Sequence, residues 1–231
     1  AVAGKRIDRV RIALVGMGAA NVATYRLLRW FGVPADAFVA CDSRGTLHRN
    51  RADIEDDRES FADKWRVCTE TNPDNTIGGI DAALRGADVC IAFSRPGPGV
   101  IRPEWVRSMA KKAIVFAGAN PVPEIWPQEA REAGAFICAT GRGDFPNQVN
   151  NSLAFPGIFR GVLDVRARAI TDPMAVAAAL ELAKCAAEQG LGSDRILPLM
   201  TDWRIHARVA AATGDSAQKH GLARIAKDKS E

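Results

Sequence analysis

The stretch RVRIALVGMGAANVATYRLLRWFGVPADAFVACD, residues 9–42, decides the fold of this 231-residue chain. Alternating charged and apolar residues lead into the run Ala13-Leu14-Val15, which is typical of a strand entering a buried sheet. Glycines at 16 and 18 follow, and apolar residues then recur at helical spacing over 19–31. A second apolar run over 37–41 stops at Asp42. This order of strand, glycine turn, helix and strand predicts a βαβ unit.

The same alternation continues beyond residue 42. Apolar runs over 87–93, 113–119 and 135–139 predict strands, and helix-like segments lie at 79–85, 103–112 and 127–133. The sequence therefore predicts an α/β fold with a doubly wound, Rossmann-type, mostly parallel sheet. Further helices are expected from Thr171-Asp172-Pro173 to about Gln189, over 204–212 and over 216–226. Because no linker-like composition intervenes, we expect these C-terminal helices (about 172–226) to pack on the sheet in one domain, 1–231.

Bulk composition argues against several classes of partner. The net charge is only +4, and basic residues (31) are interspersed with acidic ones (27), which argues against nucleic acid. No apolar run has the length of a membrane span, which argues against a membrane partner. Five scattered cysteines without a CxxC arrangement favour small buried side chains over disulfides or zinc. They predict a protein of the reducing cytoplasm.

The segment Gly16-Met17-Gly18-Ala19-Ala20-Asn21 predicts a dinucleotide site, because it matches GxGxxG/A at its first two glycines and links a strand to a helix. Backbone amides there would hold a pyrophosphate. Asn21 is larger than the usual residue, which predicts looser packing or a side chain that touches the ligand. Asp42 is placed to accept from an adenosine ribose, which favours NAD. The nearby arginines Arg44, Arg49 and Arg51 could hold the 2′-phosphate of NADP, so NADP remains an alternative cofactor. A solvated loop explains these arginines equally well.

Three predicted strands end in polar residues at the same edge of the sheet. These residues are Ser94, Asn120 and Thr140, and ligands of doubly wound sheets bind at this edge. The stretch TGRGDFPNQVNNSLAFPGIFRG, 140–161, continues from the last of them with prolines and glycines typical of a loop. Its amides and arginines fit either a carboxylate-binding loop or an internally satisfied turn, and the position of the stretch after a strand end favours a place in the cleft. These residues are Arg142, Asn147, Gln148, Asn150, Asn151 and Arg160.

The run Asn120-Pro121-Val122-Pro123-Glu124-Ile125 and the stretch 140–161 resemble the C-terminal NAD(P)-binding domain of malic enzymes, particularly the bacterial type. The resemblance implies oxidative decarboxylation of malate to pyruvate and CO2, with hydride transfer to NAD or NADP and a divalent Mg or Mn in the complete enzyme. By the same resemblance, Asn120 and Asn150 contact cofactor and substrate, and Asn151 contacts substrate. Homo-oligomers are also implied.

The family's proton-transfer Tyr and Lys and its acidic metal ligands belong to segments before the glycine loop. Only 15 residues precede Gly16, and the single tyrosine, Tyr25, is expected to be structural. We therefore expect no catalytic or metal-ligating residue here, and a cofactor half that is inactive without an N-terminal catalytic domain or partner subunit.

Two other hypotheses remain. Gly118 and Gly143 replace larger residues of the family and predict extra space near the cleft, which a dehydrogenase-like relative would use for another hydroxy or carboxylic acid. The second alternative is a non-catalytic NAD-binding module.

Overall fold

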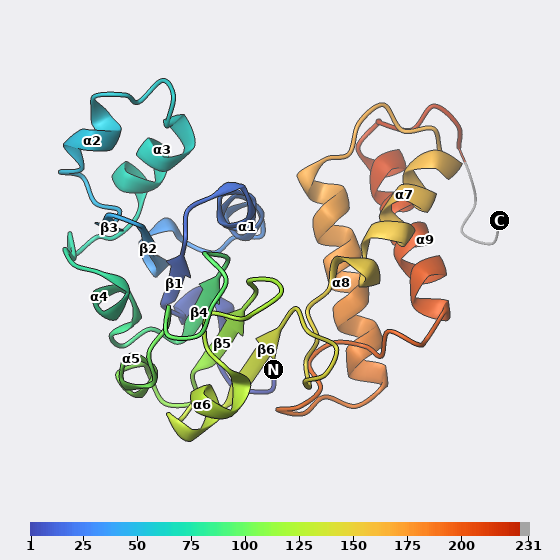
Figure 1. Cartoon of the computed structure of the whole chain (residues 1–231). Helices are drawn as coiled ribbons and strands as arrows, with labels where there is room; N and C mark the ends of the chain where they lie inside the picture. Colours follow the sequence, from blue (N-terminus) through green and yellow to red (C-terminus); the bar gives the residue numbers. More distant parts are fainter. Residues whose placement is uncertain (227–231) are drawn as a thin grey trace. The chain divides into compact units, whose positions relative to one another are not determined.

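The computed structural model describes residues 1–226 and divides the chain into two compact units, Ala1–Val149 and Asn150–Glu231 (Figure 1). The first contains all the strands described, and the second is helical over its described part. A single domain with the terminal helices packed on the sheet stays a prediction.

The first unit is built on a six-stranded sheet of order β3-β2-β1-β4-β5-β6. The strands are β1 (Ile12–Val15), β2 (Phe38–Asp42), β3 (Gly45–Thr46), β4 (Val89–Ala92), β5 (Ile114–Ala117) and β6 (Ile137–Thr140). All neighbours are parallel except β3, which pairs antiparallel with β2. The strand order reverses beside β1, which places a topological switch point between β1 and β4. The predicted Rossmann-type sheet is confirmed.

Helices cover both faces of this sheet (Figure 1). Residues Ile12 and Leu14 of β1 belong to one apolar core, and Ala13 and Val15 belong to the other, because successive side chains of a strand point to opposite faces. The first core includes side chains of α1 (Ala19–Trp30) and α3 (Ala62–Glu70). The second includes α4 (Ile80–Leu84), α5 (Pro103–Arg107) and α6 (Pro127–Glu132).

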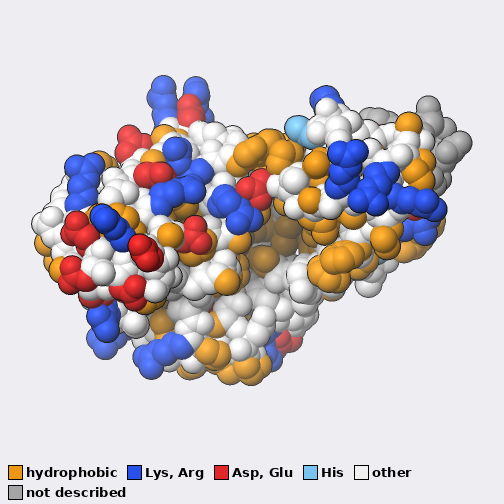
Figure 2. Space-filling view, turned by 90° about the horizontal axis from the view of Figure 1, so that it is seen from above, with side chains coloured by type: hydrophobic (Ala, Val, Ile, Leu, Met, Phe, Trp, Pro, Cys, Tyr) orange, Lys and Arg blue, Asp and Glu red, His pale blue; other side chains and the backbone are white. Residues whose placement is uncertain are grey.

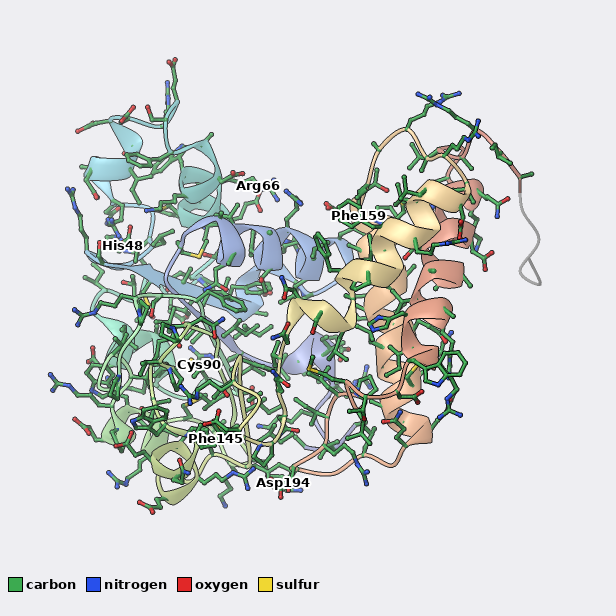
Figure 3. All side chains as sticks on the ribbon, turned by 45° about the vertical axis from the view of Figure 1, so that its right-hand side comes forward. His48, Arg66, Cys90, Phe145, Phe159 and Asp194 are labelled. Carbon is green, nitrogen blue, oxygen red and sulfur yellow. The ribbon has the colours of Figure 1, made fainter. Side chains whose placement is uncertain are left out.

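The cysteines are small core residues, as the sequence predicts. All five are free and buried, and Cys90 lies inside the sheet (Figure 3). Burial raises the pKa of Cys41 to about 12. Short elements of the first unit that the sequence did not predict are β3, α2 (Ala52–Glu55), α3 and the 3₁₀ turns η1 (Ile7–Arg9) and η2 (Ala35–Ala37).

The second unit contains η3 (Asn151–Leu153), α7 (Phe155–Asp164), α8 (Asp172–Glu188) and α9 (Arg204–Lys219). The expected helix to about Gln189 is confirmed, and Gly190 follows it with φ +87°. Two expectations are wrong. Helix α9 is continuous where two helices were expected over 204–212 and 216–226, and it ends before Gly221, which has φ +68°.

The second wrong expectation is that the whole stretch 140–161 is a loop. Pro156, Gly157 and Gly161 lie inside α7, where proline is tolerated in the first turn. The two glycines are buried against α9, and a Cβ on Gly161 would lie 2.2 Å from the carbonyl oxygen of Ala210.

Charge is evenly mixed on the visible surface of the first unit, where Lys and Arg alternate with Asp and Glu (Figure 2). Within residues 1–226, no helix combines the length and apolar character needed to cross a membrane.

Candidate cofactor site

The two glycines after β1 have different surroundings. Gly16 has φ +85°, and a Cβ there would lie 2.7 Å from the carbonyl oxygen of Phe93 and 2.9 Å from the Cα of Ser94. Only glycine fits this position, because it combines left-handed backbone with close backbone approach. Gly18 has an ordinary φ of −88°, and a Cβ there would meet no atom within 4 Å. Gly16 therefore serves the fold, whereas the open space at Gly18 suits a ligand.

Helix α1 begins at this open space with unused hydrogen-bond donors. Its first intrahelical bond runs from the Val22 amide to the Gly18 carbonyl, and no side chain caps its N-terminus. Gly18, Ala19 and Ala20 are exposed. The amides of Ala19, Ala20 and Asn21 precede that bond, and the helix dipole adds positive potential there. This arrangement can bind a phosphate group.

The side chain of Asn21 does not face this space. It is fully buried, and its Nδ2 donates to the carbonyl oxygens of Val15 (3.0 Å), Gly16 (2.8 Å) and Ile91 (3.2 Å). The amide therefore links α1 to β1 and β4. The interpretation that the Asn21 side chain contacts the ligand is therefore wrong, and only its backbone amide remains available for cofactor binding, whereas looser packing stays a prediction.

A cavity of about 380 Å³ opens beside the glycine loop. It reaches from Asp42 at the end of β2 to Ser94 after β4, which is where the strand order reverses. Its lining includes Gly16, Gly18, Asp42, Lys64, Ser94 and Arg95. Lys64 was not predicted as a site residue, because nothing in the sequence connects α3 with the end of β2.

Asp42 is surrounded by donors. Its Oδ1 accepts from the Arg44 amide (2.9 Å) and Arg51 Nη1 (3.2 Å), and its Oδ2 accepts from Arg51 Nη2 (3.2 Å) and Lys64 Nζ (3.3 Å). Burial by itself would raise the pKa of Asp42, but the hydrogen bonds from Arg51 and the Arg44 amide bring it below its ordinary value. Asp42 is thus a carboxylate whose lone pairs are all used.

Arg51 is not the residue of a solvated loop. It is 7% exposed and also pairs with Asp53, at 2.6 Å from its Nε. Arg44 is exposed and also pairs with Asp53, while Arg49 is exposed. Arg51 therefore holds Asp42 in place, and the cation on the cavity side of Asp42 is Lys64.

Glu124 joins the strand ends that carry Ser94 and Asn120. This fully buried carboxylate accepts from the Ser94 amide at 2.8 Å and from the Ala119 amide at 3.0 Å. Asn120 is exposed and precedes a cis peptide bond to Pro121. Its side chain lies close to Gly141 after β6, since a Cβ on Gly141 would be 2.7 Å from Asn120 Oδ1.

The arginines of the amide-rich stretch are already paired. Arg142 forms an ion pair with Asp144 (2.8 Å) and donates to the Pro121 carbonyl, and Arg160 pairs with Asp164 along α7. The internally satisfied turn, one of the two interpretations, also describes Asn147, whose Nδ2 donates to the carbonyl oxygen of Cys138.

Asn150 and Asn151 belong to the second unit. Asn150 caps η3, because its Oδ1 accepts from the Ser152 amide at 2.9 Å. Asn151 is exposed at the start of η3. Their predicted contacts with cofactor and substrate stay predictions.

Gly118 and Gly143 do not create space for a larger substrate. A Cβ on Gly118 would lie 2.3 Å from the ring of Phe93, and a Cβ on Gly143 would lie 3.2 Å from the side chain of Gln148. Phe93 and Gln148 fill the positions, so this expectation is wrong. The hypothesis of a different acid substrate loses the observation that suggested it.

Tyr25 is structural, as expected. It is 2% exposed, packs edge-on against Phe38 and donates to Glu70 at 2.8 Å. Burial and this hydrogen bond raise the pKa of Tyr25 to about 12. His48, after the β2–β3 hairpin, is buried and accepts from the Asn50 amide (Figure 3). Within residues 1–226, no three His, Cys, Asp or Glu side chains are grouped so as to hold a metal.

Comparison with known proteins identifies the family. A family model described as the NAD binding domain of malic enzyme matches residues 2–218. The chain is 42% identical to a bifunctional malic/malolactic enzyme of Bacillus subtilis and 39% identical to an NADP-dependent malic enzyme of Halomonas elongata. These alignments cover 100% and 96% of this chain and 54% of each relative.

A solved structure gives the same result. The malic enzyme of Entamoeba histolytica superposes with a TM-score of 0.94 at 48% identity, over 98% of this chain and 46% of that one. The chain thus spans about half the length of the relatives that it matches. On this evidence the chain belongs to the malic enzyme family and corresponds to the family's NAD-binding domain.

Proposed function

We propose that this chain binds NAD and forms the cofactor half of an enzyme that converts malate to pyruvate and CO2 by oxidative decarboxylation. The open space at Gly18, before the uncapped N-terminus of α1, carries this proposal, because a pyrophosphate needs both room and donors. The bound nicotinamide would supply the acceptor for the hydride from malate C2.

Asp42 supports NAD as the preferred cofactor. Its carboxylate accepts hydrogen bonds, whereas a 2′-phosphate beside it would be repelled. Because Arg51 and the Arg44 amide occupy the buried side, an adenosine ribose hydroxyl would replace Lys64 on Oδ2. Lys64 is the cation that the 2′-phosphate of NADP would use. The preference between the two cofactors therefore depends on Asp42, which favours NAD, and on Lys64, which favours NADP.

The remaining polar residues fit the substrate end of the site. Ser94 and Asn120 stand across the switch point from Asp42, where the nicotinamide half of a dinucleotide binds. The amide of Asn120 can donate to a substrate carboxylate without titrating, and we assign Asn150 and Asn151 the same chemistry by family likeness. No metal-ligating set exists within residues 1–226, so we assign no step to Mg or Mn. We also propose a cytoplasmic homo-oligomer.

Titration calorimetry of the chain with NADH, NADPH and malate tests the proposal. We expect NADH to bind more tightly than NADPH, and no malate-dependent reduction of NAD by this chain. Gly18→Val should abolish NADH binding while lowering the melting temperature only slightly, because a Cβ there meets no atom of the chain within 4 Å and the remaining cost is that of a poorer N-cap for α1.

Gly192→Val is the matched control. A Cβ at Gly192 also meets nothing within 4 Å, but this glycine does not line the cavity. NADH binding that survives Gly18→Val, or that Gly192→Val removes equally, would refute the assignment of the site.

A further inference from the structure

Glu124 is a fully buried carboxylate whose partners lie at the ends of two strands. Its Oε1 accepts from the amide (2.8 Å) and the hydroxyl (3.1 Å) of Ser94, which follows β4. Its Oε2 accepts from the amide of Ala119, which follows β5, at 3.0 Å. All three donors are uncharged, so these hydrogen bonds must offset the cost of burying the charge.

Backbone hydrogen bonds strengthen the same connection. The Gly97 amide donates to the Val122 carbonyl at 3.2 Å, and the Ile101 amide donates to the carbonyl of Glu124 at 3.1 Å. Residues 121–125 therefore join the loop after β4 to the loop after β5. Ser94 and Asn120 belong to these two loops.

The carboxylate offers what an amide of the same shape cannot, because both of its oxygens accept. In Glu124→Gln the side-chain oxygen would face Ser94, which has two donors. The NH2 group would then face the N–H of Ala119, and two donors would meet. The backbone immediately before Asn120 would lose its anchor.

We propose that Glu124 is a positioning residue that fixes Ser94 and Asn120 for the nicotinamide end of the cofactor. The inference rests on the proposed function. The adenosine end is assigned to Asp42, and none of the hydrogen bonds of Glu124 reaches Asp42. A change at Glu124 should therefore weaken the nicotinamide end of the cofactor much more than the adenosine end.

Calorimetric titration of the chain with NADH and with ADP-ribose, which lacks nicotinamide, separates the two ends. We expect Glu124→Gln to weaken NADH binding about tenfold and to leave ADP-ribose binding within about twofold. If Glu124 acts through Asn120, adding Asn120→Ala to Glu124→Gln should cause little further loss of NADH affinity.

Glu129→Gln is the matched control. Glu129 accepts from the Trp126 amide at 3.2 Å at the start of α6 and makes no bond to Ser94 or Ala119, so its loss should not change NADH binding. If Glu124→Gln does not fold, Ser94→Ala, which removes only the hydroxyl bond, should still weaken NADH two- to threefold and spare ADP-ribose.

Equal weakening of both ligands would show a merely structural role and overturn the proposal, as would unchanged NADH affinity. Wild-type chain that binds neither ligand would instead refute the proposed function itself, and the inference with it.

Discussion

The contact between α7 and α9 gives the sharpest quantitative prediction. A Cβ on Gly161 would lie 2.2 Å from the carbonyl oxygen of Ala210, 3.0 Å from its carbonyl carbon and 3.0 Å from the amide nitrogen of Gly214. All three are backbone atoms, which cannot rotate away as a side chain does. Gly161→Ala therefore requires the two helices to move apart.

The size of the effect follows from these distances. Bringing 2.2 Å to an ordinary contact of 3.4 Å requires a shift of 1.2 Å (3.4 − 2.2). A gap of about 1 Å forfeits a quarter to a half of the dispersion attraction, and overpacking costs about 1–3 kcal/mol. Alanine gains about 1 kcal/mol in helix propensity over glycine. With the clash near the top of its range, we expect Gly161→Ala to lower the free energy of unfolding by about 2 kcal/mol.

Gly214→Ala is the matched control on the facing helix. Its Cβ would lie 3.4 Å from Val165 Cγ1 and 3.5 Å from the Gly161 carbonyl oxygen, which are ordinary contacts. Only the propensity gain remains, so this variant should be more stable by about 0.5–1 kcal/mol. The same substitution should thus have opposite signs at two glycines that lie against each other.

Urea unfolding followed by circular dichroism at 222 nm measures both variants, since α7, α8 and α9 contribute much of the helix signal. The test compares the free energies extrapolated to water. If Gly161→Ala were as stable as Gly214→Ala, a Cβ on Gly161 could not lie 2.2 Å from the carbonyl oxygen of Ala210.

Three further predictions concern the cavity and the core. Arg95→Ala should weaken ADP-ribose about tenfold at low salt in calorimetry, because this exposed cation lines the cavity beside the glycine loop, whereas Arg107→Ala on α5 should not. At neutral pH, wild type should have a higher melting temperature than Asp42→Asn. Because folding lowers the pKa of Asp42, this difference should shrink only as the pH falls below about 4. A difference that stays constant with pH would contradict the ion pairs of Asp42 with Arg51 and Lys64. Iodoacetamide at pH 8 should label no cysteine of the folded chain and all five cysteines in urea. The reason is that burial raises the pKa of Cys41 to about 12 and also raises the pKa values of the other four thiols. Labelling of the folded chain, detected by mass spectrometry, would contradict this burial.

The parallel strands were predictable because a buried strand carries apolar residues on both faces. Five predicted runs became β1, β2, β4, β5 and β6, with bounds that differ from the predicted ones by at most three residues at either end. The region 43–78 gave no such signal. Its short helices and β3 are polar, and they are held by contacts such as Asn72 Nδ2 to the Leu47 carbonyl (3.0 Å), which join residues far apart in sequence.

Helix α7 was missed because local rules misjudge its glycines. Gly157 and Gly161 disfavour a helix by intrinsic propensity, and only the close approach of α9 explains them. That partner lies about 50 residues further along the chain. A window of neighbouring residues holds no information about such a contact, so tertiary packing decided this element.

The polar residues of the site fall into two groups, those bonded within the chain and those exposed to a ligand. The sequence does not show which residue belongs to which group, because it does not show the direction in which each side chain points. Asn21, Arg51 and Arg142 all looked available for a ligand, yet each is bonded within the chain. Gly18, Asn120 and Arg95 remain exposed. A polar group that is buried and already bonded gains nothing from a ligand, because binding would first break its existing hydrogen bonds. Ligand contacts are therefore expected mainly from exposed groups, and from a half-buried group such as Asp42 only where a ligand can replace one of its existing bonds, as at Lys64.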